Sequence, residues 1–157
     1  MNVLSWALVL LLAILVLAAG AYQLLKFIAS RDPQNLDQLQ KRTLASSAGS
    51  LKLAVADTTD SLGKGLSGHQ KLKNVHGLLL LPPEPSAALT LLGVQFPLDI
   101  VWLDAEYRVL KIARDVKPGF GTLRVPSPAG SKAVVEVPAD KLRRLGAIEP
   151  GSTLTLR

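Results

Sequence analysis

Several carboxylates in this sequence occupy positions where they could do chemistry. Asp99 follows Pro97 inside an apolar run that predicts a strand, where a carboxylate either accepts backbone N–H bonds or lines a ligand site. Asp104 and Glu106 are close neighbours, but the segment 104–107 is typical of a turn, and turn chemistry accounts for both. Asp99 is therefore the acid in this region that we regard as a candidate for ligand binding.

Glu136 is a further carboxylate within a predicted strand. It alternates with Val135 and Val137, so its side chain is expected on the opposite face of the strand from theirs. An ion pair with Lys132 or with an arginine would satisfy the carboxylate there. This interpretation makes Glu136 a structural residue.

The remaining residue types form no catalytic or metal-binding pattern. The spacing of His69 and His76 fits neither a helical metal pair nor a zinc signature, which favours solvated or capping roles. The serines lack histidine and acid partners in the sequence, so a serine nucleophile is unsupported. Gly63, Gly65 and Gly68 lack the order of a phosphate loop. We expect no catalytic residue, no metal ion and no cofactor.

Composition excludes further functional classes. The chain has 157 residues, no cysteine and a formal net charge of +6. Without cysteine there can be no disulfide, no thiolate catalysis and no zinc–thiolate site. No basic run is longer than Arg143-Arg144, and no basic stripe alternates with aromatic residues, so we expect no nucleic-acid partner.

The first 25 residues carry no charge, and the first ionisable side chain is Lys26. A bilayer core needs about 20 apolar residues in helical form, so residues 3–25 predict one helix that spans a lipid bilayer. A cleaved signal peptide is the alternative, because Ala19-Gly20-Ala21 is an acceptable cleavage pattern. The length of the apolar run and the lack of Lys or Arg before it favour a retained anchor.

Basic residues flank the span on one side only. They are Lys26, Arg31, Lys41 and Arg42, all after the span. The positive-inside rule then favours a single-pass protein with its body in the cytoplasm. A periplasmic body, or export after cleavage, is the alternative.

We predict three parts in the chain. They are a transmembrane anchor (1–28), an amphipathic stalk helix and flexible linker (29–50) and a β-rich domain (51–157). The stalk helix is expected to start at Asp32-Pro33, and Ser46–Ser50 is typical of a linker.

Apolar segments separated by turn residues predict six or seven short strands and two short helices in the last part. The strands are expected at 51–57, 78–81, 89–94, 98–103, 108–114, 132–137 and 153–156, and the helices within 58–70 and 141–145. This pattern is typical of a β-rich α+β fold, a compact antiparallel sheet or barrel-like domain with short helices.

Motifs of this third part occur in an order that resembles a known family. They are Lys64-Gly65-Leu66, Gly77-Leu78-Leu79, Phe96–Asp104, Arg108-Val109-Leu110, Pro118 and Ala133–Ala139. In this order they resemble the bacterial and archaeal family called domain of unknown function 192, over residues 51–157. The resemblance implies a small β-rich fold, often behind a signal peptide or an anchor, and it implies no known activity.

The chain departs from the family pattern at polar positions. The family has Trp-Met-Lys-Asn-Thr before its Pro-Leu-Asp motif, and here Thr90, Leu92 and Gly93 take the Trp, Lys and Asn positions. The Gly after Pro-Ala is replaced by Asp140. The apolar strand positions remain, as expected if the fold is retained and a ligand site is altered or absent.

Asp99, Pro97 and Gly77 are the candidate ligand-binding residues, each within a motif that the chain retains. Trp102 lies in an apolar run and is expected to pack in the core.

Two functional classes follow. The first is a membrane-tethered, non-enzymatic β module of the bacterial inner membrane that binds an unidentified protein partner in an envelope assembly. The second is a small-ligand-binding or hydrolytic domain with its site near Asp99. A deep polar pocket beside Asp99 with convergent donors and a raised pKa would favour the second class, and a filled apolar interior the first.

Overall fold

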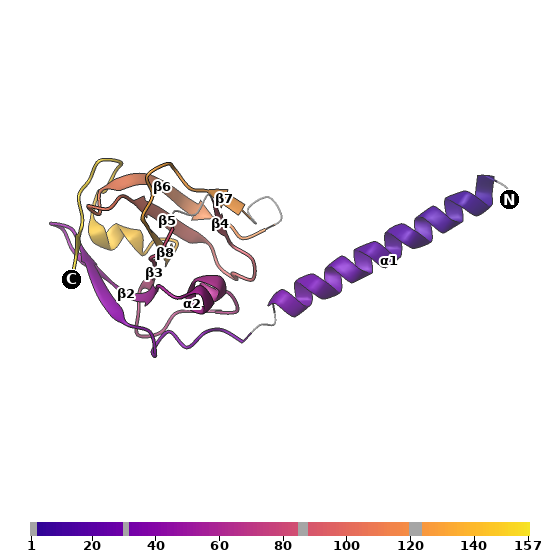
Figure 1. Cartoon of the computed structure of the whole chain (residues 1–157), viewed down its shortest axis with the longest axis horizontal. Helices are drawn as coiled ribbons and strands as arrows, with labels where there is room; N and C mark the ends of the chain where they lie inside the picture. The colour runs from indigo at the N-terminus through magenta and orange to yellow at the C-terminus, as the bar shows by residue number, and fades with distance from the viewer. Residues whose placement is uncertain (1–2, 30–31, 85–87, 120–123) are drawn as a thin grey trace.

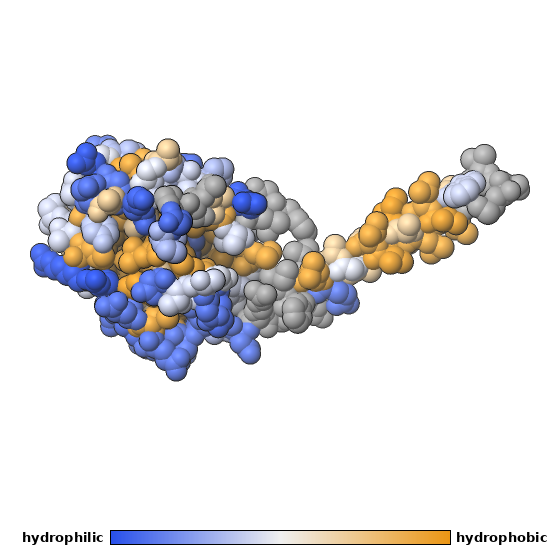
Figure 2. Space-filling view, in the orientation of Figure 1, coloured by the Kyte–Doolittle hydropathy of each residue, from blue (hydrophilic) through white to orange (hydrophobic). Residues whose placement is uncertain are grey.

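A computed structural model describes residues 3–29, 32–84, 88–119 and 124–157. The first element is one long helix, α1 (Val3–Ala29), and a β domain follows it (Figure 1). The segment Trp6–Leu24 of α1 is long and apolar enough to cross a membrane, and none of it is buried against the protein. Figure 2 shows apolar residues along this helix, whereas the visible face of the β domain mixes apolar with polar residues. The expected helix is therefore present, and its insertion into a bilayer stays a prediction.

The β domain is built on a seven-stranded sheet with the strand order β6-β5-β8-β3-β2-β1-β9. Its strands are β1 (Lys41–Ala45), β2 (Ser50–Ala56), β3 (Gly77–Leu80), β5 (Leu98–Leu103), β6 (Val109–Val116), β8 (Ala133–Pro138) and β9 (Thr155–Leu156). A separate two-stranded sheet pairs β4 (Ala88–Thr90) with β7 (Arg124–Pro126). The short helices are α2 (Thr59–Lys64) and the 3-10 helix η2 (Leu142–Leu145). The large sheet curls into a half-barrel, which confirms the expected β-rich, barrel-like fold.

One strand pair departs from the antiparallel expectation. β2 and β3 are parallel neighbours, so the chain between them must return to the starting end of the sheet. The short helix α2 lies in this return. Its start is fixed by a capping box, in which the side chain of Thr58 accepts a hydrogen bond from the backbone of Ser61 and the side chain of Ser61 accepts one from the backbone of Thr58.

The connector differs from its prediction. Residues 36–39 form only a turn and a bend, and β1 lies where part of the stalk helix was expected, so the amphipathic helix within 29–50 is wrong. β1 pairs along its whole length with β2. The segment expected as a flexible linker is the turn of this hairpin, closed by a backbone bond from Ser46 N–H to the Gly49 carbonyl. Leu36 and Leu44 are buried in the β domain, because tertiary burial outweighs a weak helical pattern.

Each face of the half-barrel has its own apolar core, because side chains alternate along the strands. Cluster 1, on one face, includes Leu53, Val101, Val135, Val137 and Leu142 of η2. Cluster 2, on the other face, includes Leu78, Ile100, Trp102 and Val134, with Leu62 of α2 and Leu89 of β4 packed against it.

Trp102 is fully buried in cluster 2, as expected. Its Nε1–H donates a hydrogen bond to Ser127 Oγ at 3.1 Å, and Lys111 Nζ lies 5.2 Å from the centroid of the ring. The indole is thus satisfied at its polar atom while its rings fill the core.

Candidate functional site

Glu136 lies in β8, where it pairs in register with Leu78 of β3 and Ile100 of β5. Paired residues share a face of the sheet, so the Glu136 side chain enters cluster 2. The residue is 3% exposed. The alternation along β8 therefore predicted the correct face of the sheet for the Glu136 side chain. That face is not exposed, because α2 and β4 cover it.

The expected ion pair of Glu136 is wrong. Lys132 is exposed to solvent, away from the buried carboxylate. Within residues 3–29, 32–84, 88–119 and 124–157, no salt bridge or side-chain hydrogen bond involves the Glu136 carboxyl; the ion pairs are Lys64–Asp60 and Lys117–Asp115. The carboxylate is thus buried without a counter-ion from the described part of the chain.

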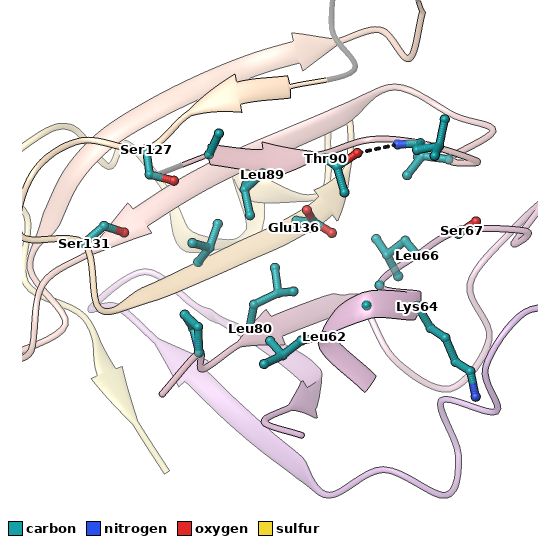
Figure 3. Close-up of a pocket in the computed structure, with 17 residues that line it drawn as sticks. Leu62, Lys64, Leu66, Ser67, Leu80, Leu89, Thr90, Ser127, Ser131 and Glu136 are labelled. Atoms are coloured by element: carbon teal, nitrogen blue, oxygen red, sulfur yellow. Dashed lines mark hydrogen bonds between the residues drawn. The ribbon is translucent and has the colours of Figure 1, made fainter. Parts of the chain in front are cut away.

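A cavity of about 310 Å³ lies beside Glu136 (Figure 3). Its described walls come from α2 and the loop after it, from β3, from β4 and the turn after it, and from the segment that leads into β8. Most lining side chains are apolar: Leu62, Leu66, Leu80, Pro82, Leu89, Leu92, Val94 and Val134. Glu136 is the one acidic residue among the described lining residues. Figure 3 shows its carboxyl between Leu89 on one side and Leu66 on the other.

The other polar groups at the cavity are hydroxyls and one lysine. Ser67, Thr90, Ser127 and Ser131 contribute hydroxyls, and Ser67 Oγ is buried without a hydrogen-bond partner in the described structure. The Lys64 ammonium instead bonds Asp60 Oδ2 at 2.8 Å, and Figure 3 shows its side chain extending away from Glu136. The cavity therefore combines apolar walls with one carboxyl and a few hydroxyls.

Burial raises the pKa of Glu136 from 4.5 to about 7, because the ionised carboxylate loses its hydration in the apolar interior. Near neutral pH the two protonation states are therefore populated to similar extents. In its ionised form the group can pair with a ligand cation, and in its neutral form it can donate one hydrogen bond.

The candidate residues from the sequence lie outside this cavity. Asp99 pairs in register with Val137, so it lies on the face of the sheet opposite to Glu136. Asp99 is buried, and its Oδ1 accepts the backbone N–H of Asp115 at 2.9 Å. Accepting a backbone N–H bond is the structural one of the two roles considered for Asp99 from the sequence. The Pro97 carbonyl accepts the backbone N–H of Ala139 at 2.9 Å.

A second depression, of about 410 Å³, adjoins Asp99 and is also lined by Arg114, Asp115, Asp140 and Arg143. All four of these charged neighbours are exposed, so the depression is open to solvent rather than a deep pocket. Ligand binding by Asp99, Pro97 and Gly77 stays a prediction.

Gly77 has a packing role next to Glu136. A Cβ atom built at Gly77 would overlap the Glu136 carbonyl oxygen and the side chain of Val137. Only glycine lets β3 approach β8 this closely, and this approach sets the position of the Glu136 backbone.

The two histidines lie apart from the cavity. His76 Nδ1 accepts the backbone N–H of Lys52 at 2.9 Å, and burial together with the nearby charges of Arg144, Lys141 and Lys52 lowers the pKa of His76. Burial also lowers the pKa of His69, whose Nε2 is buried without a partner in the described structure. The described residues contain no group of three or more His, Cys, Asp or Glu side chains that could hold a metal ion.

A signal for the Glu136 cavity was present in the sequence but was missed. The run Ala133–Pro138 has apolar residues at every position except Glu136, including Val134 on the same face. Such a run is typical of a strand that is buried on both faces, which places the acid in the interior. Alternation alone indicates the face and does not indicate whether another layer covers it.

The fold and cavity define a small β half-barrel with a buried acid in the wall of an apolar pocket. The chain belongs to the family called domain of unknown function 192, described as an uncharacterized ACR, whose model matches residues 41–156. The match begins at Lys41, the first residue of β1, which agrees with the sheet starting earlier than residue 51.

Two solved structures share this fold. A protein of unknown function from Novosphingobium aromaticivorans is 25% identical, with a TM-score of 0.62, and the match covers 79% of this chain and 91% of that one. A Sinorhizobium meliloti protein, provisionally described as a transcription regulator, is 22% identical with a TM-score of 0.62, over 73% of this chain and 92% of that one. No curated protein matches the chain.

Proposed function

We propose that this protein is a membrane-anchored, non-enzymatic binding module that holds a small, mainly apolar ligand in the pocket beside Glu136. The observation that carries this proposal is the cavity of about 310 Å³, walled largely by leucine and valine, which holds a carboxyl without a salt-bridge partner among the described residues. Ligand pockets commonly have volumes of about 300–1,000 Å³ and apolar walls with a few placed polar groups.

The position of the pocket relative to α1 supports an amphiphilic ligand. Gln34 Nε2 donates to the carbonyls of Ser61 at 3.2 Å and Gly65 at 2.6 Å, and Gly65 lines the pocket. Asp32 and Gly63 line one surface depression, so Asp32 lies against the pocket rim.

Chain length keeps this rim close to the end of the span. Residues 25–29 complete α1 at about 1.5 Å each, and the next three residues reach Asp32 at no more than about 3.6 Å each. Asp32 is therefore within about 20 Å of the last residue of the apolar segment. For a chain anchored in a bilayer by α1, this short distance supports a pocket near the membrane surface, where amphiphilic molecules concentrate.

The composition of the pocket supports binding rather than catalysis. Its described lining offers one acid, Glu136, several hydroxyls, and Lys64, whose ammonium is paired with Asp60. Hydrolysis requires a nucleophile, a base and a stabilising group that converge on one point, and the described lining provides no such set.

Flanking charge supports a body on the cytoplasmic side of a bacterial inner membrane. The apolar segment of α1 also supports action beside a protein partner in the envelope, as proposed from the sequence. Recovery of the intact chain from native membranes with a stoichiometric partner would support this association, and recovery of the chain alone would argue against it.

Methyl NMR of the intact chain in phosphatidylcholine nanodiscs tests the pocket. With 1-hexanol as the probe, we expect saturable shifts of the Leu89, Val94 and Val134 methyl signals. Leu92→Trp fills the cavity and should abolish these shifts. The matched control is Leu156→Trp, at a half-buried position that packs against cluster 1. If the pocket methyls do not respond, or if they respond equally in Leu92→Trp, the proposed function is wrong.

A further inference from the structure

We infer that the ligand is an organic amine, whose ammonium group pairs with the Glu136 carboxylate while its apolar body fills the leucine-lined cavity. This inference rests on the proposed binding function and adds the chemical class of the ligand.

The first argument is that Glu136 is buried without a counter-ion from the described residues. A carboxylate that is 3% exposed has lost nearly all of its hydration, and an uncompensated buried charge costs several kcal/mol. A ligand ammonium that enters the same cavity supplies the missing counter-ion in an environment of low dielectric constant, where the attraction is strong.

The groups that face Glu136 provide the second argument. The paired residues on β3 and β5 are Leu78 and Ile100, which carry no charge. From α2, the nearest basic group is Lys64, which bonds Asp60 and points away in Figure 3. The described lining from β4, from the turn after it and from the segment before β8 adds no titratable side chain. No described neighbour therefore competes with a ligand cation.

The hydroxyls provide the third argument. An ammonium group has three N–H donors and no acceptor. The carboxylate can accept one or two of them, and Thr90, which lines the same cavity and is drawn near Glu136 in Figure 3, carries an oxygen that can accept another. Ser67 Oγ, buried without a partner in the described structure, is a further acceptor at the wall. An anionic ligand would be repelled by the ionised carboxylate.

A set of probes with similar apolar bodies tests the ligand class. We would titrate hexylamine, 1-hexanol, 2-heptanone and hexanoate into the intact chain in phosphatidylcholine nanodiscs, with the pocket methyl signals as the readout. At pH 8, hexylamine is expected to bind at least tenfold more tightly than 1-hexanol, and hexanoate most weakly. In Glu136→Gln, hexylamine should lose this advantage, whereas the matched control Glu106→Gln, at an exposed turn position, should keep it.

The pH dependence provides a test that needs no variant. A carboxyl with a pKa of about 7 is ionised to about a tenth at pH 6 and to about nine tenths at pH 8, while an alkylamine stays protonated. The affinity for hexylamine should therefore rise close to tenfold between these two values, even if Glu136→Gln fails to fold.

The possible results separate the two proposals. If hexylamine and 1-hexanol bind equally, the pocket functions but the ligand class is wrong. If 2-heptanone binds most tightly, and more weakly as the pH rises, Glu136 acts as a neutral hydrogen-bond donor and the amine inference is overturned. If none of the probes shifts the pocket methyls, the proposed function itself fails.

Discussion

The buried carboxyl of Glu136 makes the stability of the β domain depend on pH. Its pKa is 4.5 in the unfolded chain and about 7 in the folded domain, so the folded state binds the proton more tightly. Between these pH values the folded state holds more protons than the unfolded state, and the free energy of unfolding therefore falls as the pH rises. The difference of about 2.5 between the pKa values corresponds to about 3 kcal/mol of stability, which is fully present below about pH 4.5 and is lost as the pH rises through about 7.

We therefore expect Glu136 to lower the free energy of unfolding by about 2.5 kcal/mol between pH 5 and pH 8, and we expect Glu136→Gln to remove this slope. The lowered pKa values of His69 and His76 act in the opposite direction, because a base that is neutral in the folded state costs stability as the pH falls. Both histidines are present in wild type and in Glu136→Gln, so the difference between the two pH profiles isolates the contribution of Glu136.

Urea denaturation of the intact chain in detergent micelles measures this difference. The chain has two tryptophans, so Trp6→Phe leaves buried Trp102 as the sole tryptophan, whose fluorescence reports on the β domain. Glu106→Gln, at an exposed turn, is the control and should keep the wild-type slope. Parallel pH profiles for wild type and Glu136→Gln would refute the reasoning, because they would mean that the carboxyl is hydrated or paired in the folded domain.

The same assay, with circular dichroism for the tryptophan variant, checks three more predictions, and the NMR titration checks a fourth. Trp102→Ala should lower the free energy of unfolding by about 3–5 kcal/mol, since the indole is fully buried; unchanged melting would contradict its core role. Gly77→Ala should cost about 1–3 kcal/mol, because its Cβ overlaps β8, whereas Gly63→Ala, with open space around it, should not destabilise the domain. Asp140→Gly should raise the free energy of unfolding by about 1 kcal/mol. Asp140 has a φ of 75°, in the left-handed region that strains a residue with a side chain and that glycine adopts freely. Leu92→Lys should abolish hexylamine binding in the NMR titration, because it supplies the pocket with its own ammonium group.

Local patterns were sufficient to predict most strands of the fold. The apolar segment 98–103 and the run 132–137 match β5 and β8 closely. The segment 89–94 is a strand only up to Thr90, because a turn follows in which Leu92 N–H bonds Thr90 Oγ1. Strand order was beyond reach of local patterns, since the parallel neighbours β2 and β3 are brought together by a long connection.

The first strand, β1, shows why the prediction of a stalk helix within residues 29–50 is wrong. Leu36, Leu39 and Leu44 recur at a loose helical spacing, and Pro33 is a favourable helix start. In the structure Leu44 is buried beside Leu51 of β2, its partner in register. Leu44 also pairs in register with Leu156 of β9, at the other end of the domain sequence, so helical spacing alone could not reveal its partners.

The candidate site could be located only in part, because a pocket depends on layers that come from distant segments. The sequence placed Glu136 on the correct face, yet the cover over that face comes from Leu62 of α2 and Leu89 of β4. Asp99 is a candidate from the sequence because an acid in an apolar strand is unusual. In the structure its carboxylate accepts a hydrogen bond from the backbone N–H of Asp115.

One departure from the family pattern lies in the wall of this pocket and changes its chemistry. The resemblance places the Lys of the family's Trp-Met-Lys-Asn-Thr motif at Leu92, and the structure places Leu92 in the wall of the cavity that holds Glu136. A lysine at that position would bring an ammonium group to the same pocket as the carboxylate, whereas leucine brings only an apolar surface. The substitution therefore does two things at once: it leaves the carboxylate without a partner from this wall, and it enlarges the apolar area available to a ligand. Both changes favour a ligand that carries its own cation on an apolar body, which is the class inferred from the contacts of Glu136 alone.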